Sequence, residues 1–318
     1  MKALIGWLPD FLVKFFARPY VAGDSLESGL TAAKSLLEER GVLTTLDLLY
    51  EGVDDDEALQ EVSAVYRSMI DEVAKRFDGP GRPTVSLKPS SYTKRPLDRF
   101  PGGEPVGSYE AIREFAQLAR DRNVNLTIDM EDRHWTTWTL DAARRLHTEG
   151  HDHVGVVLQT RLERTAADID ALPEGMRVRL VIGIYNEAAE FATLDKAVMK
   201  ERLLSHARTL LERGHYVEFA THDQRYVRRF LEEVVPATAA TPANFEVQML
   251  YGVPMQAFQN ELLKGTVGPQ GPVKVRLYVP FATSWEYAIA YCRRRLLENP
   301  SMATAVARNV ARVLTFRR

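Results

Sequence analysis

Short runs rich in β-branched residues alternate with longer amphipathic segments along most of the chain. Val273–Val279 shows the first pattern, because apolar and polar residues alternate in it as they do in a strand. Ser25–Arg40 shows the second, because Leu26, Leu30 and Ala33 lie on one helical face. Eight strands are predicted in this way, at Thr44–Leu49, Thr84–Leu87, Asn125–Met130, Val154–Gln159, Arg177–Ile184, Tyr216–Ala220, Phe245–Leu250 and Lys274–Val279.

The segments between the predicted strands read as helices. They include Asp54–Phe77, Ser108–Asn123, Thr136–Thr148, Asp195–Glu212 and Gln224–Val234. About eight β/α repeats in one chain are the pattern of a (β/α)8 barrel, and a doubly wound open sheet is the main alternative. The number of repeats favours the barrel, and no glycine-rich dinucleotide fingerprint follows the first strand.

We predict a single domain over residues 1–318. N-terminal helices are expected over 1–40, the barrel with a final helix over 41–300, and a C-terminal helix or tail over 301–318. The segments 78–82 and 236–244 are interpreted as loops between repeats. Met1–Tyr20 is apolar and aromatic, with Pro9 interrupting it. We expect it to form a helix packed on the domain, and a surface that touches a membrane is the alternative.

The last predicted strand leads into a helix. We expect Pro280 to end the strand, and Thr283 with Glu286 has the spacing of a capping box, which predicts that the helix begins there. Pro300 restricts the residue before it, so the helix is expected to end at about Asn299.

Two columns of functional side chains are expected on this helix. Arg294 and Glu298 are four residues apart and share a face, and Tyr287, Tyr291 and Arg295 form a second column beside them. Guanidinium groups bind carboxylates or phosphates bidentately, so a binding site is predicted. A solvated basic face is the alternative.

Composition narrows the classes of function. The chain has 318 residues, 45% of them hydrophobic, which is enough for one large core. A formal net charge of -2 argues against binding nucleic acid, and the single cysteine, Cys292, allows no internal disulfide. No apolar run reaches the length of a membrane span, and no secretory signal is evident. We expect a cytoplasmic protein, and peripheral contact with the inner membrane face is the alternative.

Polar residues stand near the end of almost every predicted strand. In a (β/α)8 barrel the active site lies at the carboxyl ends of the strands, so these residues are candidates for it. They are Ser86, Lys88, Asp129, Glu131, Gln159, Thr160, Arg179, Tyr185, Thr221, His222, Asp223, Gln248 and Tyr278.

These segments resemble those of the proline dehydrogenase family. In that family a strand ending in Tyr-x-Pro precedes a helix with Tyr-x-x-Arg-Arg-x-x-Glu-Asn, and the matching positions are Tyr278, Pro280, Arg294, Arg295, Glu298 and Asn299. Family-like motifs also occur at Thr45-Leu-Asp47 and, in the family's order, at Lys88, Asp129, Gln159, Arg179, Thr221, His222 and Leu250. The sequence departs from the family at Ile182, where a lysine is usual, and at Asp223, where an asparagine is usual. Its segment Pro280–Glu286 is about one residue longer than in some members.

The resemblance implies a distorted (β/α)8 barrel that binds FAD non-covalently at its top, with the final helix over the flavin ring. It implies oxidation of L-proline to Δ1-pyrroline-5-carboxylate, the first step of proline catabolism to glutamate, with electrons passed to a quinone. Asp129 and Arg179 are the implied catalytic residues, Asp129 bonding Tyr278 and Arg179 lying near flavin N5. The implied substrate-binding residues are Lys88, Tyr278, Arg294, Arg295, Leu250 and Glu298. The implied cofactor-binding residues are Met130, Gln159, Arg179, Val181, Ile182, Gly183, Ile184, Thr221 and His222.

Other functions remain as alternatives. A barrel enzyme without flavin, or a non-catalytic binding protein, would use the same arginines to hold a small carboxylate or phosphate metabolite. We expect no metal at the site, since His147, His151 and His153 precede the fourth strand and should lie on the bottom face of the barrel.

Overall fold

A closed barrel of eight parallel strands forms the centre of the computed structural model, which describes residues 10–50 and 53–298. The strands follow one another around the barrel in chain order, and β8 closes on β1. The strands are β1 (Leu43–Leu49), β2 (Thr84–Leu87), β3 (Leu126–Ile128), β4 (Val154–Gln159), β5 (Arg177–Val181), β6 (Tyr216–Ala220), β7 (Phe245–Leu250) and β8 (Val275–Ala282). The predicted (β/α)8 barrel is confirmed, and the open doubly wound sheet is excluded.

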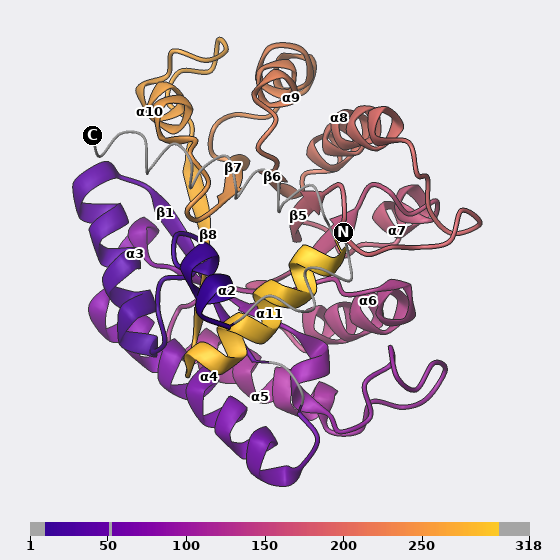
Figure 1. The fold of residues 1–318 in the computed structure, drawn as a ribbon. Coiled ribbons are helices and arrows are strands. Elements are labelled where there is room, and N and C mark those ends of the chain that lie inside the picture. Colours follow the sequence, from indigo (N-terminus) through magenta and orange to yellow (C-terminus); the bar gives the residue numbers. More distant parts are fainter. Residues whose placement is uncertain (1–9, 51–52, 299–318) are drawn as a thin grey trace.

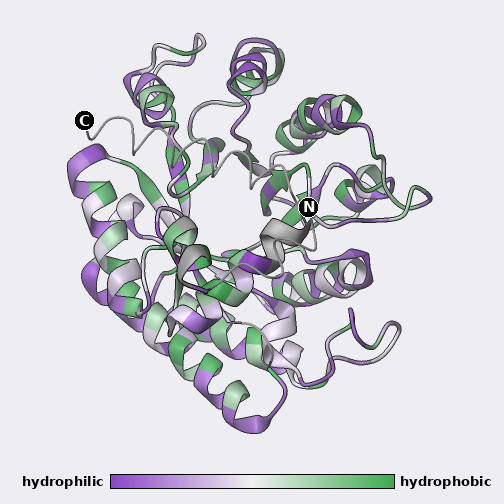
Figure 2. Cartoon of the chain, in the orientation of Figure 1, coloured by the Kyte–Doolittle hydropathy of each residue, from purple (hydrophilic) through white to green (hydrophobic). Residues whose placement is uncertain are grey.

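Most of the helices surround the barrel on its outer side, whereas the first and the last of the described helices lie over one end of it (Figure 1). The described helices are α2 (Asp10–Ala17), α3 (Leu26–Arg40), α4 (Asp56–Arg76), α5 (Ser108–Asp121), α6 (Arg133–Thr148), α7 (Thr165–Asp170), α8 (Lys196–Glu212), α9 (Gln224–Arg229), α10 (Gln256–Lys264) and α11 (Trp285–Glu298). In Figure 2 the outer helices carry both hydrophobic and hydrophilic bands, as amphipathic helices do. The apolar core lies between these helices and the strands, where side chains such as Leu158 of β4 and Leu140 of α6 are buried.

Two strands differ from their predicted length for local reasons. β5 ends at Val181 instead of Ile184, because Gly183 has a φ of 89°, outside the range of a strand. β8 does not end at Pro280 but runs on to Ala282. The last residues paired between β7 and β8 are Leu250 and Tyr278, so Pro280 lies beyond the end of β7. Proline has no N–H, but at this position no β7 residue needs a hydrogen bond from it.

The final helix begins later than predicted. α11 starts at Trp285, and the buried hydroxyl of Thr283 has no hydrogen-bond partner among the described residues, so the expected capping box with Glu286 is not formed. β8 stays paired with β1 as far as Ala282, so it extends beyond the end of β7 before the helix begins. As a result, α11 crosses the barrel axis in Figure 1 and does not join the outer ring of helices.

The predicted helix Gln224–Val234 is divided. α9 ends at Arg229, and the next five residues, Phe230–Val234, form a π-helix. Phe230 stacks on Phe219 of β6 with ring centroids 4.2 Å apart. The wider turn buries several large side chains of this short segment against the barrel, which explains the departure from a regular α-helix.

The described part of the N-terminal segment packs on α11. Asp10 accepts a hydrogen bond of 2.5 Å from Arg293, and Lys14 lies 4.6 Å from the ring centroid of Trp285. Val13 and Ala17 are buried. A helix packed on the domain is therefore confirmed for Asp10–Ala17, while residues 1–9 lie outside the described part of the chain.

Candidate active site

Four of the predicted side chains meet inside the barrel near the carboxyl ends of its strands. Lys88 follows β2, Asp129 follows β3, Arg179 belongs to β5 and Tyr278 to β8. Successive side chains of a strand point to opposite faces, so an inward residue on each strand fixes which of its neighbours also face the barrel interior. Residues far apart in sequence are thereby brought into hydrogen-bond distance.

Asp129 is the centre of this group. Its Oδ1 accepts hydrogen bonds from Ser86 Oγ at 2.7 Å and from Arg179 Nη1 at 2.8 Å, and its Oδ2 accepts one from the Tyr278 hydroxyl at 2.6 Å. The expected bond between Asp129 and Tyr278 is therefore present. The ammonium nitrogen of Lys88 lies 3.9 Å from Asp129 Oδ2, so two cations and two hydroxyls surround one carboxylate.

Lys88 has a second carboxylate partner, Asp47 of β1, which is completely buried and accepts a hydrogen bond from the lysine. Burial by itself lowers the pKa of Lys88, but attraction by Asp47 and Asp129 outweighs this and raises the pKa above its ordinary value. The lysine stays cationic at neutral pH. In the sequence, Asp47 stands out only as part of the family-like motif Thr45-Leu-Asp47. Residues two apart on a strand face the same side, so the position of Asp47 two residues after Thr45 was the available sign that it faces the barrel interior.

Glu131 joins two strand ends that carry candidate residues. Its carboxylate accepts hydrogen bonds from Ser90 N at 2.9 Å and Ser90 Oγ at 2.6 Å, and its carbonyl accepts one from Gln159 Nε2 at 2.8 Å. Burial raises the pKa of Glu131 to about 7, against the opposing effect of the bonds from Ser90. Gln159 is thereby held at the end of β4.

Gly183 closes the space beside Gln159. A Cβ atom on this glycine would lie 2.5 Å from Gln159 Oε1 and 2.8 Å from Arg161 Cδ, and the positive φ disfavours other residues as well. The turn after β5 therefore requires glycine, and the backbone at this point stays free of any side chain.

The ends of β6 and β7 are tied by His222. Its Nε2 accepts a hydrogen bond of 2.9 Å from the backbone N–H of Leu250, and burial lowers the pKa of His222. The neutral imidazole of His222 is therefore the form that can accept this hydrogen bond. Thr221, the neighbouring candidate, donates its backbone N–H to the Gln248 carbonyl at 3.2 Å.

The two departures from the family motif have different surroundings. Asp223 caps α9 by accepting from Arg225 N at 3.1 Å, and it pairs with Lys200 at 2.5 Å, so its charge is compensated. Ile182 is half-buried and packs against the apolar core. No cation stands at position 182.

The remaining apolar candidates lie at or near the rim. Met130 is buried and Val181 half-buried, whereas Ile184 is 45% exposed and Leu250 is 43% exposed. Large exposed apolar side chains at strand ends are free to contact a bound molecule.

The substrate arginines predicted from the sequence fall on α11. Its backbone is described to Glu298, but the side chains of Arg294, Arg295 and Glu298 lie outside the described residues. The helix contacts β1, β8 and α2, and it lies over the same end of the barrel as the Asp129 group (Figure 1).

A tyrosine pair anchors α11 to the barrel. Tyr287 stacks on Tyr50, just past β1, with ring centroids 4.1 Å apart, and its hydroxyl donates to the Tyr50 hydroxyl at 2.9 Å. Tyr50 in turn donates to Glu61 of α4 at 2.9 Å. The sequence indicated Tyr287 as part of a column of side chains on the final helix. It gave no sign of the partner Tyr50, which directly follows an apolar strand and has no polar motif around it.

Below the Asp129 group, the barrel interior holds an ion-pair network in which Gln248 was a predicted site residue but the two glutamates and their arginine partners were not. Glu246 accepts from Arg276 Nε at 2.5 Å, and Glu218 accepts from Arg177 Nη2 at 2.8 Å. Gln248 donates to both carboxylates at 2.7 Å and accepts from Arg179 Nε at 2.8 Å. The floor of the candidate site is therefore polar and fully paired, and it fixes Arg179 from below.

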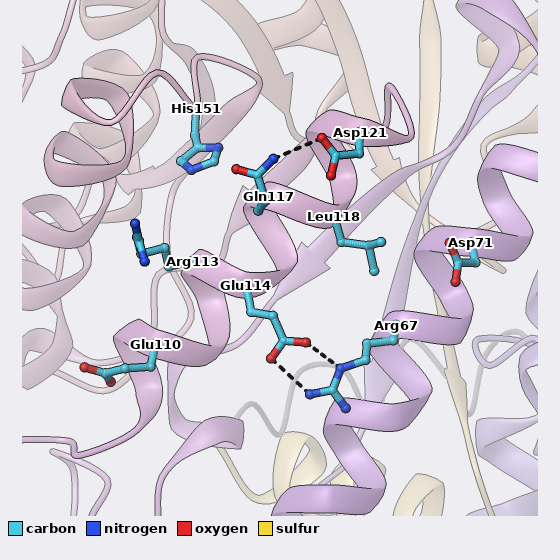
Figure 3. Close-up of a pocket in the computed structure, with 9 residues that line it drawn as sticks. All are labelled: Arg67, Asp71, Glu110, Arg113, Glu114, Gln117, Leu118, Asp121 and His151. Atoms are coloured by element: carbon cyan, nitrogen blue, oxygen red, sulfur yellow. Dashed lines mark hydrogen bonds and ion pairs between the residues drawn. The ribbon is translucent and has the colours of Figure 1, made fainter.

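A groove on the outer face of the molecule lies apart from this site (Figure 3). It runs between α4 and α5, and several of its charged side chains are paired, as in the bidentate bond between Arg67 and Glu114. The lining residues are Arg67, Asp71, Glu110, Arg113, Glu114, Gln117, Leu118, Asp121 and His151. Their position on the outer helices separates the groove from the strand ends.

The histidines before β4 lie at its amino end, as predicted. His147 Nε2 is 2.8 Å from the Val154 carbonyl, and His153 Nε2 is 3.0 Å from the Ala116 carbonyl. Within residues 10–50 and 53–298, no cluster of histidine, cysteine and acidic side chains has the arrangement of a metal site. No helix in that part of the chain has the length and hydropathy needed to cross a membrane.

Sequence comparison places this geometry among related proteins. The family model described as proline dehydrogenase matches residues 30–308. A protein named proline dehydrogenase from Deinococcus radiodurans is 33% identical over 303 residues, which cover 92% of this chain and 89% of that protein. Proline dehydrogenase 1 of Bacillus subtilis (strain 168) is 29% identical over 310 residues, covering 97% of this chain and 95% of that protein.

Solved structures share the fold. Proline utilization A of Bdellovibrio bacteriovorus, inactivated by N-propargylglycine, superposes with a TM-score of 0.75 at 20% identity over 88% of this chain. A variant of proline utilization A from Bradyrhizobium japonicum superposes with a TM-score of 0.68 at 24% identity over 87% of this chain. The chain spans about a third of the length of these two proteins, 32% and 30% respectively.

Proposed function

Because the chain belongs to the proline dehydrogenase family, we propose that it oxidises L-proline to Δ1-pyrroline-5-carboxylate with FAD as its cofactor. The observation that carries the proposal is the convergence of Lys88, Arg179 and Tyr278 on Asp129 at the carboxyl end of the barrel. That is where (β/α)8 enzymes hold their catalytic residues.

The residues present fit a flavin. Arg179 is buried, and its Nη2 has no hydrogen-bond partner among the described residues, so a donor is left for an electronegative atom of a bound molecule. Gly183 keeps the backbone beside Gln159 free of side chains. Gln159, Arg179, Gly183, Thr221 and His222 are the residues that we propose hold the cofactor, with Met130, Val181, Ile182 and Ile184 around it.

The chemistry that FAD supplies when bound is the two-electron oxidation of a carbon–nitrogen bond. The chain's part is to position the substrate. Lys88 stays protonated beside Asp47 and supplies one cation for the proline carboxylate, and we propose that Arg294 and Arg295 of α11 supply two more. A carboxylate held in this way fixes the pyrrolidine ring, which is a large contribution to catalysis.

The hydrogen bond between Asp129 and Tyr278 sets the position of the tyrosine ring that is proposed to contact the substrate. Asp129 is fixed by three donors, and it holds the Tyr278 hydroxyl and thereby the orientation of the tyrosine ring. We propose that this ring and Leu250 form the wall of the proline pocket, and that Glu298 holds Arg294 one helical turn away. Oxidation removes a hydride equivalent from proline C5 and a proton from its nitrogen.

We propose a quinone as the final electron acceptor and the cytoplasm as the location, with the inner membrane face as the place where a lipid-soluble quinone is reached. The experiment that tests the proposed function is a visible absorption spectrum of the purified protein. If the protein is purified without flavin absorbance, FAD is added and the spectrum is recorded again. We expect flavin absorbance and formation of the pyrroline product from L-proline with a soluble quinone. A protein that takes up no FAD, yet binds small carboxylates, would instead support the alternative of a flavin-free barrel.

A further inference from the structure

Arg161 is a buried arginine at the carboxyl end of the barrel that forms no ion pair with a carboxylate of the described residues. It lies two residues after the end of β4, and only 8% of its surface is exposed. Within the described residues no acidic oxygen lies within 4.0 Å of its guanidinium, although most other arginines of the structure have such a partner. A buried charge without a counter-charge is costly, so a partner for this one is expected.

The surroundings of Arg161 leave part of its guanidinium unused. Nη1 donates to the backbone carbonyl of Tyr185, and the buried Nε has no hydrogen-bond partner among the described residues. Burial lowers the pKa of Arg161, and Glu187 offsets this only in part. Glu187 itself accepts from the backbone N–H of Arg133 at 2.8 Å and so is committed elsewhere.

The side chain is held firmly in this position. Its backbone N–H donates to the Ile182 carbonyl at 3.2 Å, and its carbonyl accepts from Thr193 N at 2.8 Å. Its methylene groups lie against Gly183, where a Cβ atom would come within 2.8 Å of Arg161 Cδ. The methylene stem of Arg161 therefore lies beside Gly183, and the bond from Nη1 to the Tyr185 carbonyl holds the guanidinium.

We propose that Arg161 binds the diphosphate of the dinucleotide cofactor. This inference rests on the proposed function, because it assigns a further residue to the FAD site. FAD carries its negative charge on its two phosphates, and a guanidinium fork matches phosphate oxygens. The substrate carboxylate is the less suitable partner, because β4 and β5 lie opposite β8 and β1 in the closed barrel, and α11 with its arginines follows β8.

The test measures flavin binding without turnover. Protein stripped of flavin is titrated with FAD and with riboflavin, which lacks phosphate, and flavin fluorescence gives each dissociation constant. We expect Arg161→Met to weaken FAD binding by about 10- to 100-fold, the range for loss of one charged hydrogen bond, and to change riboflavin binding less than about twofold. Arg161→Lys should retain part of the affinity for FAD.

Two further variants separate the role of the charge from that of the fold. Arg202→Met removes a nearby arginine that already has a partner, Glu163 at 2.7 Å, and should leave both constants unchanged. Ile182→Lys in the Arg161→Met background places a cation on the adjacent strand end and should restore FAD binding in part. Thermal unfolding of each flavin-free variant shows whether it is folded, and Arg161→Gln replaces Arg161→Met if the latter is not.

The outcomes distinguish this inference from the proposed function. Wild-type protein that takes up neither flavin overturns both. Wild-type protein that binds FAD, together with an Arg161 variant that binds it equally well, overturns the inference alone. An equal loss of affinity for FAD and riboflavin also overturns it, because Arg161 would then act on the shared flavin ring or on the fold.

Discussion

At the scale of single residues, the site depends on carboxylates whose surroundings differ. Asp129 has three hydrogen-bond donors at 2.6–2.8 Å, and Asp47 faces Lys88 in a completely buried position. Glu131 is shielded without a cation at bonding distance, and its pKa is raised to about 7. The first two balance the cations of the site, while Glu131 serves as a hydrogen-bonded link between strand ends.

Tyr278 gives a prediction about substrate choice. We expect the wild-type protein to prefer proline over 4-hydroxyproline, because the tyrosine ring is proposed to crowd the edge of the substrate that carries the hydroxyl. Tyr278→Ser should lower kcat/KM for proline and narrow the preference by about tenfold. Tyr278→Phe keeps the ring but loses the bond to Asp129, so it should retain most of the preference. Equal use of both substrates by the wild type would contradict this position for Tyr278.

Glu131 gives a prediction about pH. The folded protein keeps this carboxyl protonated up to about pH 7, whereas the ordinary pKa is 4.5, so the folded state binds more protons between these values. The stability that protonated Glu131 contributes is fully present below pH 4.5 and is lost as the pH rises through about 7. Glu131→Gln removes this term, so the free energy of unfolding of wild type relative to the variant should fall by roughly 1–3 kcal/mol between about pH 5 and pH 8.

The measurement is denaturant unfolding of both proteins at the two pH values. Glu110→Gln, at an exposed position on α5, is the matched control and should follow the wild type throughout. A relative stability of the Glu131 variant that stays constant with pH would show that the carboxyl titrates normally.

At the scale of elements, α11 decides whether the site is complete. It lies across the carboxyl end of the barrel, and the Tyr50–Tyr287 stack, the bond to Glu61 and the Arg293–Asp10 pair hold it there. These contacts come from Tyr50 just past β1, which α4 holds through Glu61, and from α2, so the position of the helix depends on separate parts of the fold. A helix fixed from several sides is suited to presenting arginines at a constant distance from the strand ends.

The arginines of α11 give a prediction about turnover. Arg294→Met or Arg295→Met should lower kcat/KM for proline by about 10- to 100-fold, because the substrate carboxylate loses one charged partner. FAD should remain bound, since the proposed cofactor residues lie on other elements. Arg208→Met, at an exposed position on α8 where the arginine pairs with Glu212, is the matched control. Near-normal kinetics in both test variants would mean that these arginines form only a solvated face.

Much at this scale could be predicted from the sequence. Four strands have the predicted bounds, because turn residues and apolar runs define them locally. The end of β8 was missed, since the effect of Pro280 depends on where the neighbouring β7 stops. The start of α11 was missed because Thr283 has its hydroxyl buried, which the spacing of a capping box does not reveal.

The candidate site was predictable to a similar degree. The bond between Asp129 and Tyr278 was implied by the family resemblance, and the structure contains it. Tyr50 and Arg161 gave no local signal, since their roles depend on partners more than 20 residues away in the chain. Long-range partners of this kind are fixed by the packing of whole elements.

At the scale of the whole molecule, the closed barrel places two kinds of residues on opposite sides of one opening. The strand ends of β4 to β6 carry most of the proposed cofactor residues, while β2, β8 and α11 carry most of the proposed substrate residues. Asp129 and Arg179 lie between them and are bonded to each other at 2.8 Å. The ion-pair network of Glu218, Glu246 and Arg276 lies beneath them in the barrel interior, and α11 lies over the opposite, carboxyl end.

The proposed reaction is the transfer of electrons from L-proline to a flavin at this end of the barrel. The most direct test is anaerobic addition of L-proline to the FAD-loaded protein while its visible spectrum is recorded. We expect the absorbance of oxidised flavin to disappear with L-proline and to persist with D-proline. Flavin that dithionite reduces but L-proline leaves oxidised would contradict this proposal.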